Sequence, residues 1–290
     1  MSTFAVKGTT GGAGGPHDGP VTGLPWAVLR LHRAALIAWG AFLLAAIGAL
    51  VWEVEVTAES VRDRIAACGD DPGLCRIRAL VDYSGTVSWA STLVYYSFFA
   101  VAAWAGAALI GRELENGTAQ LAWTQSVSPT RWLAAKLAVP ALLLTAGGTV
   151  FVFVFRWAWA AHRDLMGDDW THTDIFAARG PAVVAYGLCG LGVGALAGVV
   201  LRRSLPALGV ACVVMYLINH NLEEYRGQLW PTSGTAGPEG GPPDTWELPN
   251  GTLHPESHYW PLHLVETGIV LAVALVTTGT AFWLLRRRTA

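Results

Sequence analysis

Six stretches of this sequence are long and apolar enough to cross a lipid bilayer as helices. The hydrocarbon core of a bilayer requires about 20 residues of helix. An open sheet would leave backbone groups unsatisfied in lipid, and a helix that is apolar on every side has no face to offer to water. The sequence therefore predicts an all-α, polytopic membrane protein with six transmembrane helices, at about residues 34–52, 87–111, 133–155, 181–201, 204–222 and 264–285.

The charge content agrees with this class of fold. Asp, Glu, Lys and Arg make up 14% of the chain, against roughly 25% in a soluble domain. Residues 1–25 are rich in glycine and lack the apolar core of a signal peptide, so we expect a flexible cytoplasmic tail followed by one transmembrane domain over residues 26–288. The single run of arginines, Arg286 to Arg288, follows the last span, and no basic domain suggests a nucleic-acid partner.

The distribution of charge predicts the orientation. If both termini are cytoplasmic, the inner segments hold 11 basic and three acidic residues, and the outer loops hold eight basic and 17 acidic residues. Basic residues favour the cytoplasmic side. The loops after the second and fourth spans, with Arg112, Arg202 and Arg203, decide which side is cytoplasmic. The sequence therefore predicts cytoplasmic N- and C-termini and a multi-pass protein of the bacterial inner membrane.

Cysteines and histidines are the candidate ligands and cross-links outside the membrane. Cys68 and Cys75 lie in the first outer loop, where a disulfide is expected on an oxidising face; two free thiols are the alternative. Cys189 and Cys212 lie within spans and suit packing. Several outer residues could form a metal site, although no recognised spacing links them and solvated histidines are the simpler interpretation: His162, His172, His220, His254, His258, His263, Asp168, Asp169, Glu223 and Glu224.

The sequence argues against catalysis in this chain. No phosphate-binding loop is present, and Lys7 and Lys136 are the only lysines. The spans offer no facing Ser and His at mid-membrane. Glu266 and Arg156 are expected near the outer edge of the bilayer, so the ionisable groups that mark an ion-coupled pathway are nearly absent from the spans. We expect neither a catalytic residue, nor a cofactor, nor a resident metal in this chain.

Glycines of the fourth span form a pattern of their own. Gly190, Gly194 and Gly198 recur every four residues and so share one helix face. Small residues at this spacing let another helix approach closely. The face is either a subunit interface or sliding contact, or a site of static packing within one subunit.

The inner loop between the second and third spans carries the sharpest local signal, Gly111-Arg-Glu-Leu-Glu-Asn-Gly-Thr-Ala-Gln-Leu-Ala-Trp to Lys136. Arg112 to Asn116 predict a charged helix end, and Gly117 permits a sharp turn. Thr118 is expected to cap a new short helix, which Ser128-Pro129 would end.

This segment resembles the ABC type-2 exporter permease family. In that family a Glu-x-Gly-Thr element is followed by a short helix, a Ser/Pro-Arg turn and a Lys that begins the third span. The matching positions are Glu115, Gly117, Thr118, Pro129, Arg131 and Lys136, and the six spans match too. The long outer loops before the fourth and sixth spans depart from the family, which leaves the substrate class open. The Ala, Gly, Arg and Trp content is typical of a GC-rich, actinobacterial-like source.

The resemblance implies a half-transporter for export. Two permease copies, identical or different, would form the substrate path, and separate ABC ATPase subunits would bind ATP and magnesium beneath them. Coupling to the ATPase would involve Arg112, Glu113, Glu115, Gly117, Thr118, Pro129, Arg131 and Lys136. The alternative is a non-transporting sensor or assembly factor that binds a ligand through its outer loops. An inner loop that tolerates scrambling would favour that alternative.

Overall fold

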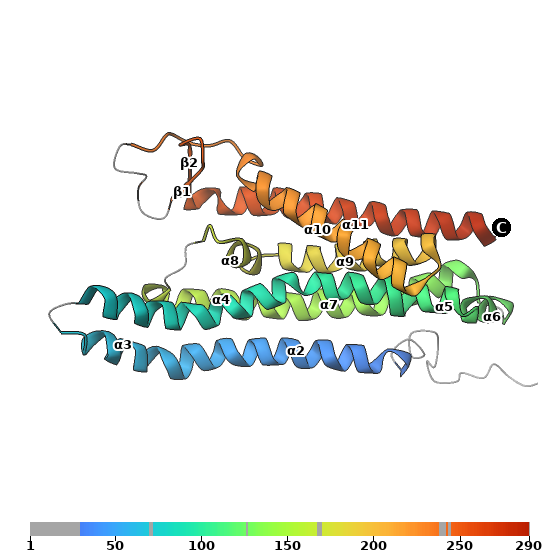
Figure 1. The fold of residues 1–290 in the computed structure, drawn as a ribbon, viewed down its shortest axis with the longest axis horizontal. Helices are drawn as coiled ribbons and strands as arrows, with labels where there is room; N and C mark the ends of the chain where they lie inside the picture. The colour runs from blue at the N-terminus through green and yellow to red at the C-terminus, as the bar shows by residue number, and fades with distance from the viewer. Residues whose placement is uncertain are drawn as a thin grey trace, which may run out of the picture.

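The computed structural model describes residues 30–69, 72–125, 127–166, 170–237, 242 and 245–289. The predicted tail, residues 1–25, lies outside the described residues. Six helices are long and apolar enough to span a membrane within the described part of the chain, which confirms the predicted fold class. They lie roughly side by side along the long axis of the molecule (Figure 1).

The helices extend beyond the apolar stretches that predicted them. The first runs through α2 (Arg33–Trp52), a π-helical turn η1 (Glu53–Thr57) and α3 (Ala58–Ala66). The second runs through α4 (Pro72–Trp104), η2 (Ala105–Gly111) and α5 (Arg112–Glu115). At 1.5 Å per residue the 33 residues of α4 alone extend about 50 Å, well beyond a hydrocarbon core of about 30 Å. The polar flanks therefore continue as helix into the aqueous phase.

The remaining helices and strands complete the chain. They are the short helix α6 (Thr118–Thr124), then α7 (Pro129–Ala161), η3 (Arg163–Leu165), α8 (Thr173–Ala178), α9 (Ala182–Leu201), α10 (Ser204–Tyr225), η4 (Arg226–Gln228), β1 (Thr245–Glu247), β2 (Leu253–Pro255), η5 (Glu256–His258) and α11 (Tyr259–Thr289). The strands pair antiparallel in the last outer loop, a small departure from a purely helical chain.

Helix α9 lies at the centre of the bundle, and its glycines explain why. A Cβ atom on Gly190 would lie 2.7 Å from the carbonyl oxygen of Phe98, and one on Gly198 would lie 2.9 Å from Cβ of Ile110. A Cβ on Gly194 would collide with the carbonyl oxygen of Ala102. The glycine face therefore packs against α4 and η2 of the same chain.

The outer ends of the first two long helices form a hairpin. Cys68 and Cys75 are joined as a disulfide at its tip, with Cα atoms 5.8 Å apart. Arg64 and Asp82 form an exposed ion pair at 3.4 Å between the two arms. The free thiols, Cys189 and Cys212, lie on α9 and α10. In Figure 1 this hairpin and the β1–β2 loop lie at one end of the molecule, and α5, α6 and the C-terminus lie at the other. These ends are called outer and inner after the topology that the sequence predicts.

Candidate functional site

The inner end of the bundle holds the predicted coupling residues. Gly117 has φ +74°, a left-handed conformation that favours glycine, and the chain reverses there between α5 and α6. Thr118 does not cap α6, contrary to the prediction, because it is already the first residue of that helix. Its hydroxyl donates instead to the carbonyl oxygen of Glu113, at 3.2 Å. Ser128 caps α7 by accepting from the backbone N–H of Arg131, at 3.3 Å.

Glu113 ties this turn to α7. Its carboxylate forms an ion pair with the buried Lys136 and accepts a hydrogen bond from the Trp132 indole, at 3.2 Å. Lys136 also lies 3.2 Å from Nε2 of His32. Burial and the charge of Lys136 lower the pKa of His32 to about 4. The imidazole is therefore neutral at pH 7 and can accept from the ammonium group.

Glu115 ties the same turn to a different span. Its Oε2 atom accepts from the backbone N–H of Ser204, at 2.9 Å, and from the Ser204 hydroxyl. Ser204 is the first residue of α10, so the carboxylate satisfies a donor that a helix start leaves unpaired and complements the helix dipole. The sequence singled out Glu115, but only the fold brings it to a helix 89 residues away.

The short helix α6 follows these two anchors in the chain and lies at the inner end of the molecule (Figure 1). Ala119 is fully buried, and the Trp123 and Trp132 rings meet edge to face at 5.8 Å. Leu121 points away from this packing and is 60% exposed. Arg112 and Arg131 are also exposed. Helix α6 therefore exposes an apolar residue between two segments with exposed basic residues, and it follows directly on α5, which is fixed to α7 and α10.

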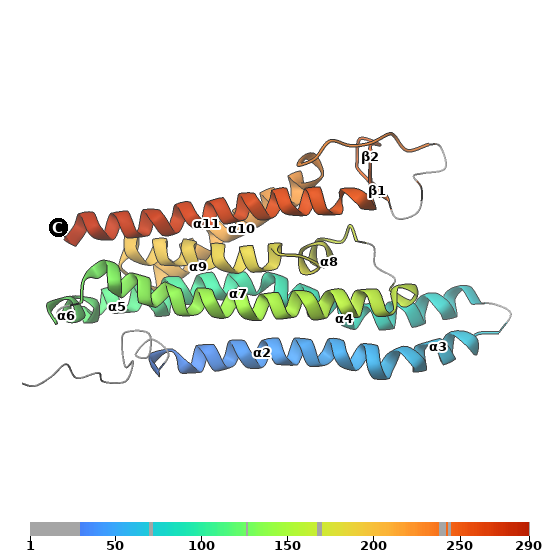
Figure 2. The same ribbon diagram turned by 180° about the vertical axis from the view of Figure 1, so that it is seen from behind.

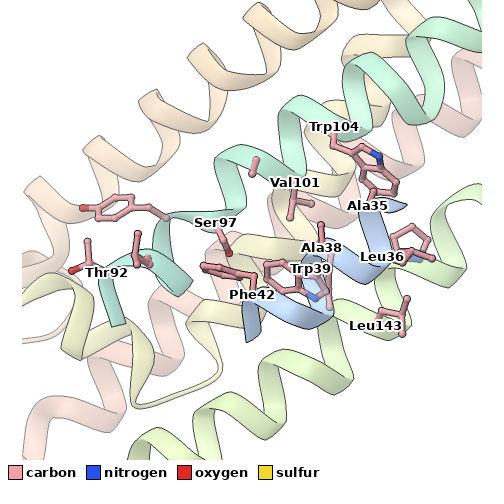
Figure 3. Close-up of a pocket in the computed structure, with 15 residues that line it drawn as sticks. Ala35, Leu36, Ala38, Trp39, Phe42, Thr92, Ser97, Val101, Trp104 and Leu143 are labelled. Carbon is pink, nitrogen blue, oxygen red and sulfur yellow. The ribbon is translucent and has the colours of Figure 1, made fainter. Parts of the chain in front are cut away.

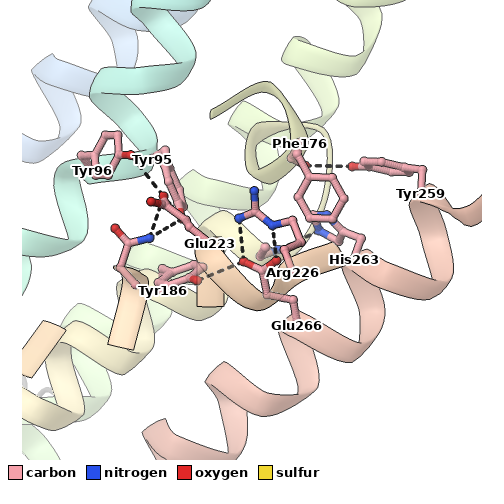
Figure 4. Close-up of polar contacts among 11 residues, drawn as sticks. Tyr95, Tyr96, Phe176, Tyr186, Glu223, Arg226, Tyr259, His263 and Glu266 are labelled. Carbon is pink, nitrogen blue, oxygen red and sulfur yellow. Dashed lines mark hydrogen bonds and ion pairs between the residues drawn. The ribbon is translucent and has the colours of Figure 1, made fainter. Parts of the chain in front are cut away.

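A second polar cluster lies at the outer end of the bundle (Figure 4). Arg226 donates to Glu266 from Nε at 2.6 Å and from Nη2 at 3.0 Å, and their side chains are 2% and 0% exposed. The Tyr186 hydroxyl donates to the same carboxylate, at 2.9 Å. The Arg226 guanidinium lies 4.4 Å from the centre of the Phe176 ring.

This cluster shows what the sequence did not predict, the burial of two charged residues inside the bundle. Glu266, expected at the outer edge of the last span, lies within α11 and is 0% exposed. Arg226, assigned to an outer loop, lies in η4 directly after α10 and is 2% exposed. Arg156 does lie at the outer part of α7, with its guanidinium 5.1 Å from the Trp260 ring centre. The sequence contained a signal for the pair, since a lone acid within an apolar helix needs a buried partner.

Glu223 and Asp174 are carboxylates that hydroxyl and amide groups hold in place beside this cluster. Glu223 accepts from Tyr95 at 3.2 Å, from Tyr96 at 3.1 Å and from Asn219 at 2.8 Å. Asp174, at the start of α8, accepts from Ser88, Ser91 and Thr92 on α4, at 3.3, 2.6 and 2.8 Å. Among the residues that the structure describes, neither carboxylate has a salt-bridge partner.

A cavity of about 550 Å³ separates α2 from α4 and α7. Its lining is mostly apolar and aromatic, with Trp39 and Phe42 from α2 and Trp104 from α4 (Figure 3). Thr92 and Tyr96 line it toward the outer end of α4. The volume lies within the range of small-molecule sites, about 300–1,000 Å³. Helix α2 packs loosely at this place, because Leu43 and Leu50 are the buried residues of its 20.

The outer histidines do not converge. His162 contacts Arg62, at 2.8 Å, and His220 stacks on Tyr216. His254 and His258 meet through their Nδ1 atoms, at 2.9 Å. Asp168 and Asp169 lie outside the described residues. Within the described part of the chain, no three His, Cys, Asp or Glu side chains gather where a metal ion could bind.

Comparison with known families gives one match. Residues 39–225 match the model of a family described as ABC-2 membrane transporter related. The matched segment runs from α2 to the end of α10 and contains the whole inner turn with Glu113, Glu115 and Lys136. No curated protein and no solved structure matches this chain.

Proposed function

Because this chain belongs to the ABC-2 membrane transporter related family, a family of transporter membrane subunits, we propose that it is the permease of an ATP-driven exporter. Two copies, or this chain and a related one, form the substrate path in a bacterial cell membrane. ATP and magnesium bind to separate ATPase subunits on the cytoplasmic side. The matched family supports the transporter role, and the geometry of the inner turn supports the coupling.

The observation that carries the proposal is the double anchoring of α5 and of the turn that leads from it into α6. Glu113 fixes the turn to α7 through Lys136, and Glu115 fixes it to the start of α10 through Ser204. A partner that displaces α6 therefore acts on three long helices at once, because α5 continues directly into η2 and α4. A conformational signal needs such a contact between rigid elements.

The exposed surface of α6 suits an ATPase partner. Leu121 supplies an apolar anchor on a short helix, as helix-in-groove recognition requires. Arg112 and Arg131, exposed on the helices before and after α6, add positive charge. The cytoplasmic location of this end is supported by the arginines that gather there. Arg286, Arg287 and Arg288 end α11 at the same end of the molecule as α6 (Figure 2).

The test compares coupling with folding. Leu121→Asp should leave membrane insertion intact and abolish ATPase co-purification, whereas Thr289→Asp, an exposed change at the same end outside α6, should change neither. Glu115→Arg should keep the fold, because a lost helix cap costs about 1 kcal/mol, and should abolish transport. Gly117→Pro should also keep the fold and abolish transport, since proline cannot adopt the positive φ that the turn requires.

The measurements are co-purification from the native host and substrate-stimulated ATP hydrolysis in reconstituted vesicles. If the Leu121, Glu115 and Gly117 variants all bind an ATPase and transport like the parent protein, the inner turn is only a connector. The absence of any ATPase partner would favour the sensor or assembly factor instead.

A further inference from the structure

The cavity between α2, α4 and α7 is elongated and has chemically different ends. Thr92 and Trp104 line its two ends and are 12 residues apart on α4, which corresponds to about 18 Å along a helix. Between them the wall is aromatic, with the Trp39 and Phe42 ring centres 5.7 Å apart. Figure 3 shows Thr92 at one end and Trp104 at the other. The space therefore fits a rod-shaped, largely apolar molecule.

The hydroxyl groups of the cavity select the charge of that molecule. A hydroxyl has one proton to donate. Thr92 donates it to Asp174 at 2.8 Å, Tyr96 donates it to Glu223 at 3.1 Å, and Ser97 donates it to the carbonyl oxygen of Val94 at 2.6 Å. Each oxygen is left with lone pairs only. Bonded in this way, these hydroxyl groups can accept from a donor or a cation, and they offer no proton to an anion.

The carboxylates behind these hydroxyls reinforce the preference. Glu223 and Asp174 lie one hydrogen bond from the cavity wall at the outer end, and no described cation forms a salt bridge with either of them. At the inner end, Lys136 is already paired with Glu113, and the neutral His32 ring meets Trp104 edge to face at 5.5 Å. The outer end is therefore the negative end.

We propose that this cavity binds a rod-shaped lipophilic organic cation, with its positive group beside Tyr96 and Thr92 and its apolar body between Trp39, Phe42 and Trp104. The face of an aromatic ring attracts a cation, so Tyr96 contributes through both its ring and its oxygen. As the substrate class of the exporter, this inference rests on the function proposed above. Binding itself requires no ATPase and is measured without one.

The experiment compares two fluorescent rods that share one apolar body. Diphenylhexatriene is neutral, and its trimethylammonium derivative carries one positive charge. Each is titrated into the protein in phosphatidylcholine nanodiscs, and the saturable tryptophan-to-probe energy transfer is measured against empty nanodiscs. We expect saturable binding of the cation at least about tenfold tighter than any saturable binding of the neutral rod, from one nearby uncompensated charge.

Variants locate the site. Glu223→Gln keeps an acceptor oxygen for the surrounding donors but removes the charge, and it should weaken cation binding about tenfold. Glu224→Gln, a change of the exposed neighbouring acid, is the matched control and should have no effect. Tyr96→Phe, which keeps the ring but removes the hydroxyl group, should weaken binding of the cation and leave binding of the neutral rod unchanged. Ala100→Trp fills the cavity and should abolish binding, whereas Val213→Trp on the exposed face of α10 should not.

Equal saturable binding of both rods would identify the cavity as a slot for lipid chains and overturn the proposal. Cation binding that is unchanged by Glu223→Gln, Tyr96→Phe and Ala100→Trp would place the cation elsewhere and overturn it as well. Failure of the exporter function is a separate result, because it shows in ATPase co-purification. Cation binding without any ATPase partner would support the binding site and contradict only its role in transport.

Discussion

Replacement of Arg226 by methionine tests whether the buried pair with Glu266 stabilises the outer half of the bundle. The guanidinium makes two hydrogen bonds to the carboxylate, at 2.6 and 3.0 Å, and both side chains are at most 2% exposed. Arg226→Met leaves a fully buried carboxylate with Tyr186 as its remaining hydrogen-bond donor. Removing one partner of a buried ion pair costs about 3–5 kcal/mol, and we expect a loss of free energy of unfolding in that range.

A matched control separates burial from charge. Arg62 pairs with Asp164 at 3.3 Å, also at the outer end, but the two side chains are 46% and 62% exposed. Arg62→Met should cost no more than about 1 kcal/mol, as exposed ion pairs do. The double variant Arg226→Met/Glu266→Leu should recover most of the loss, because replacing a whole buried pair with apolar residues is often neutral.

Equilibrium unfolding in mixed micelles with increasing dodecyl sulfate measures these differences. A loss below about 1 kcal/mol for Arg226→Met would contradict the reasoning, because it would mean that water or another cation reaches Glu266. A double variant as unstable as the single one would also contradict it, since the cost would then come from lost packing against Phe176 and not from the unpaired charge.

Three further predictions need one measurement each. A reporter that is active only in the cytoplasm, fused after Arg288, should be active, and silence there would reverse the assigned orientation. Digestion without reductant should release a peptide linked through Cys68 and Cys75, and complete alkylation of both in fresh membranes would exclude the disulfide. Gly194→Ala should destabilise the bundle by about 1–3 kcal/mol, because its Cβ meets backbone of α4. Gly40→Ala, with nothing within 4 Å, should be neutral or stabilising by about 0.5–1 kcal/mol; equal effects in the same unfolding assay would contradict the packing argument.

Apolar length alone determined the class of fold. A lipid environment admits few spanning structures, so six long apolar stretches are enough to predict six helices without any knowledge of their contacts. The inner turn was also readable in outline, because a positive φ favours glycine and Gly117 has it. These features depend on residues close together in the chain, and local physics is sufficient to predict them.

Pairings between distant residues were decided only by the tertiary structure. Arg226 and Glu266 are 40 residues apart and lie on different helices, and the sequence placed one in a loop and the other at a membrane edge. Glu115 could be singled out, but its partner Ser204 could not. The hydropathy of a helix says how much of it avoids water and not which side faces which neighbour. The rotation of each span was therefore decided by tertiary contacts, such as the packing of the glycine face of α9 against α4. The cavity between α2, α4 and α7 depends on these rotations and could not be predicted from the sequence.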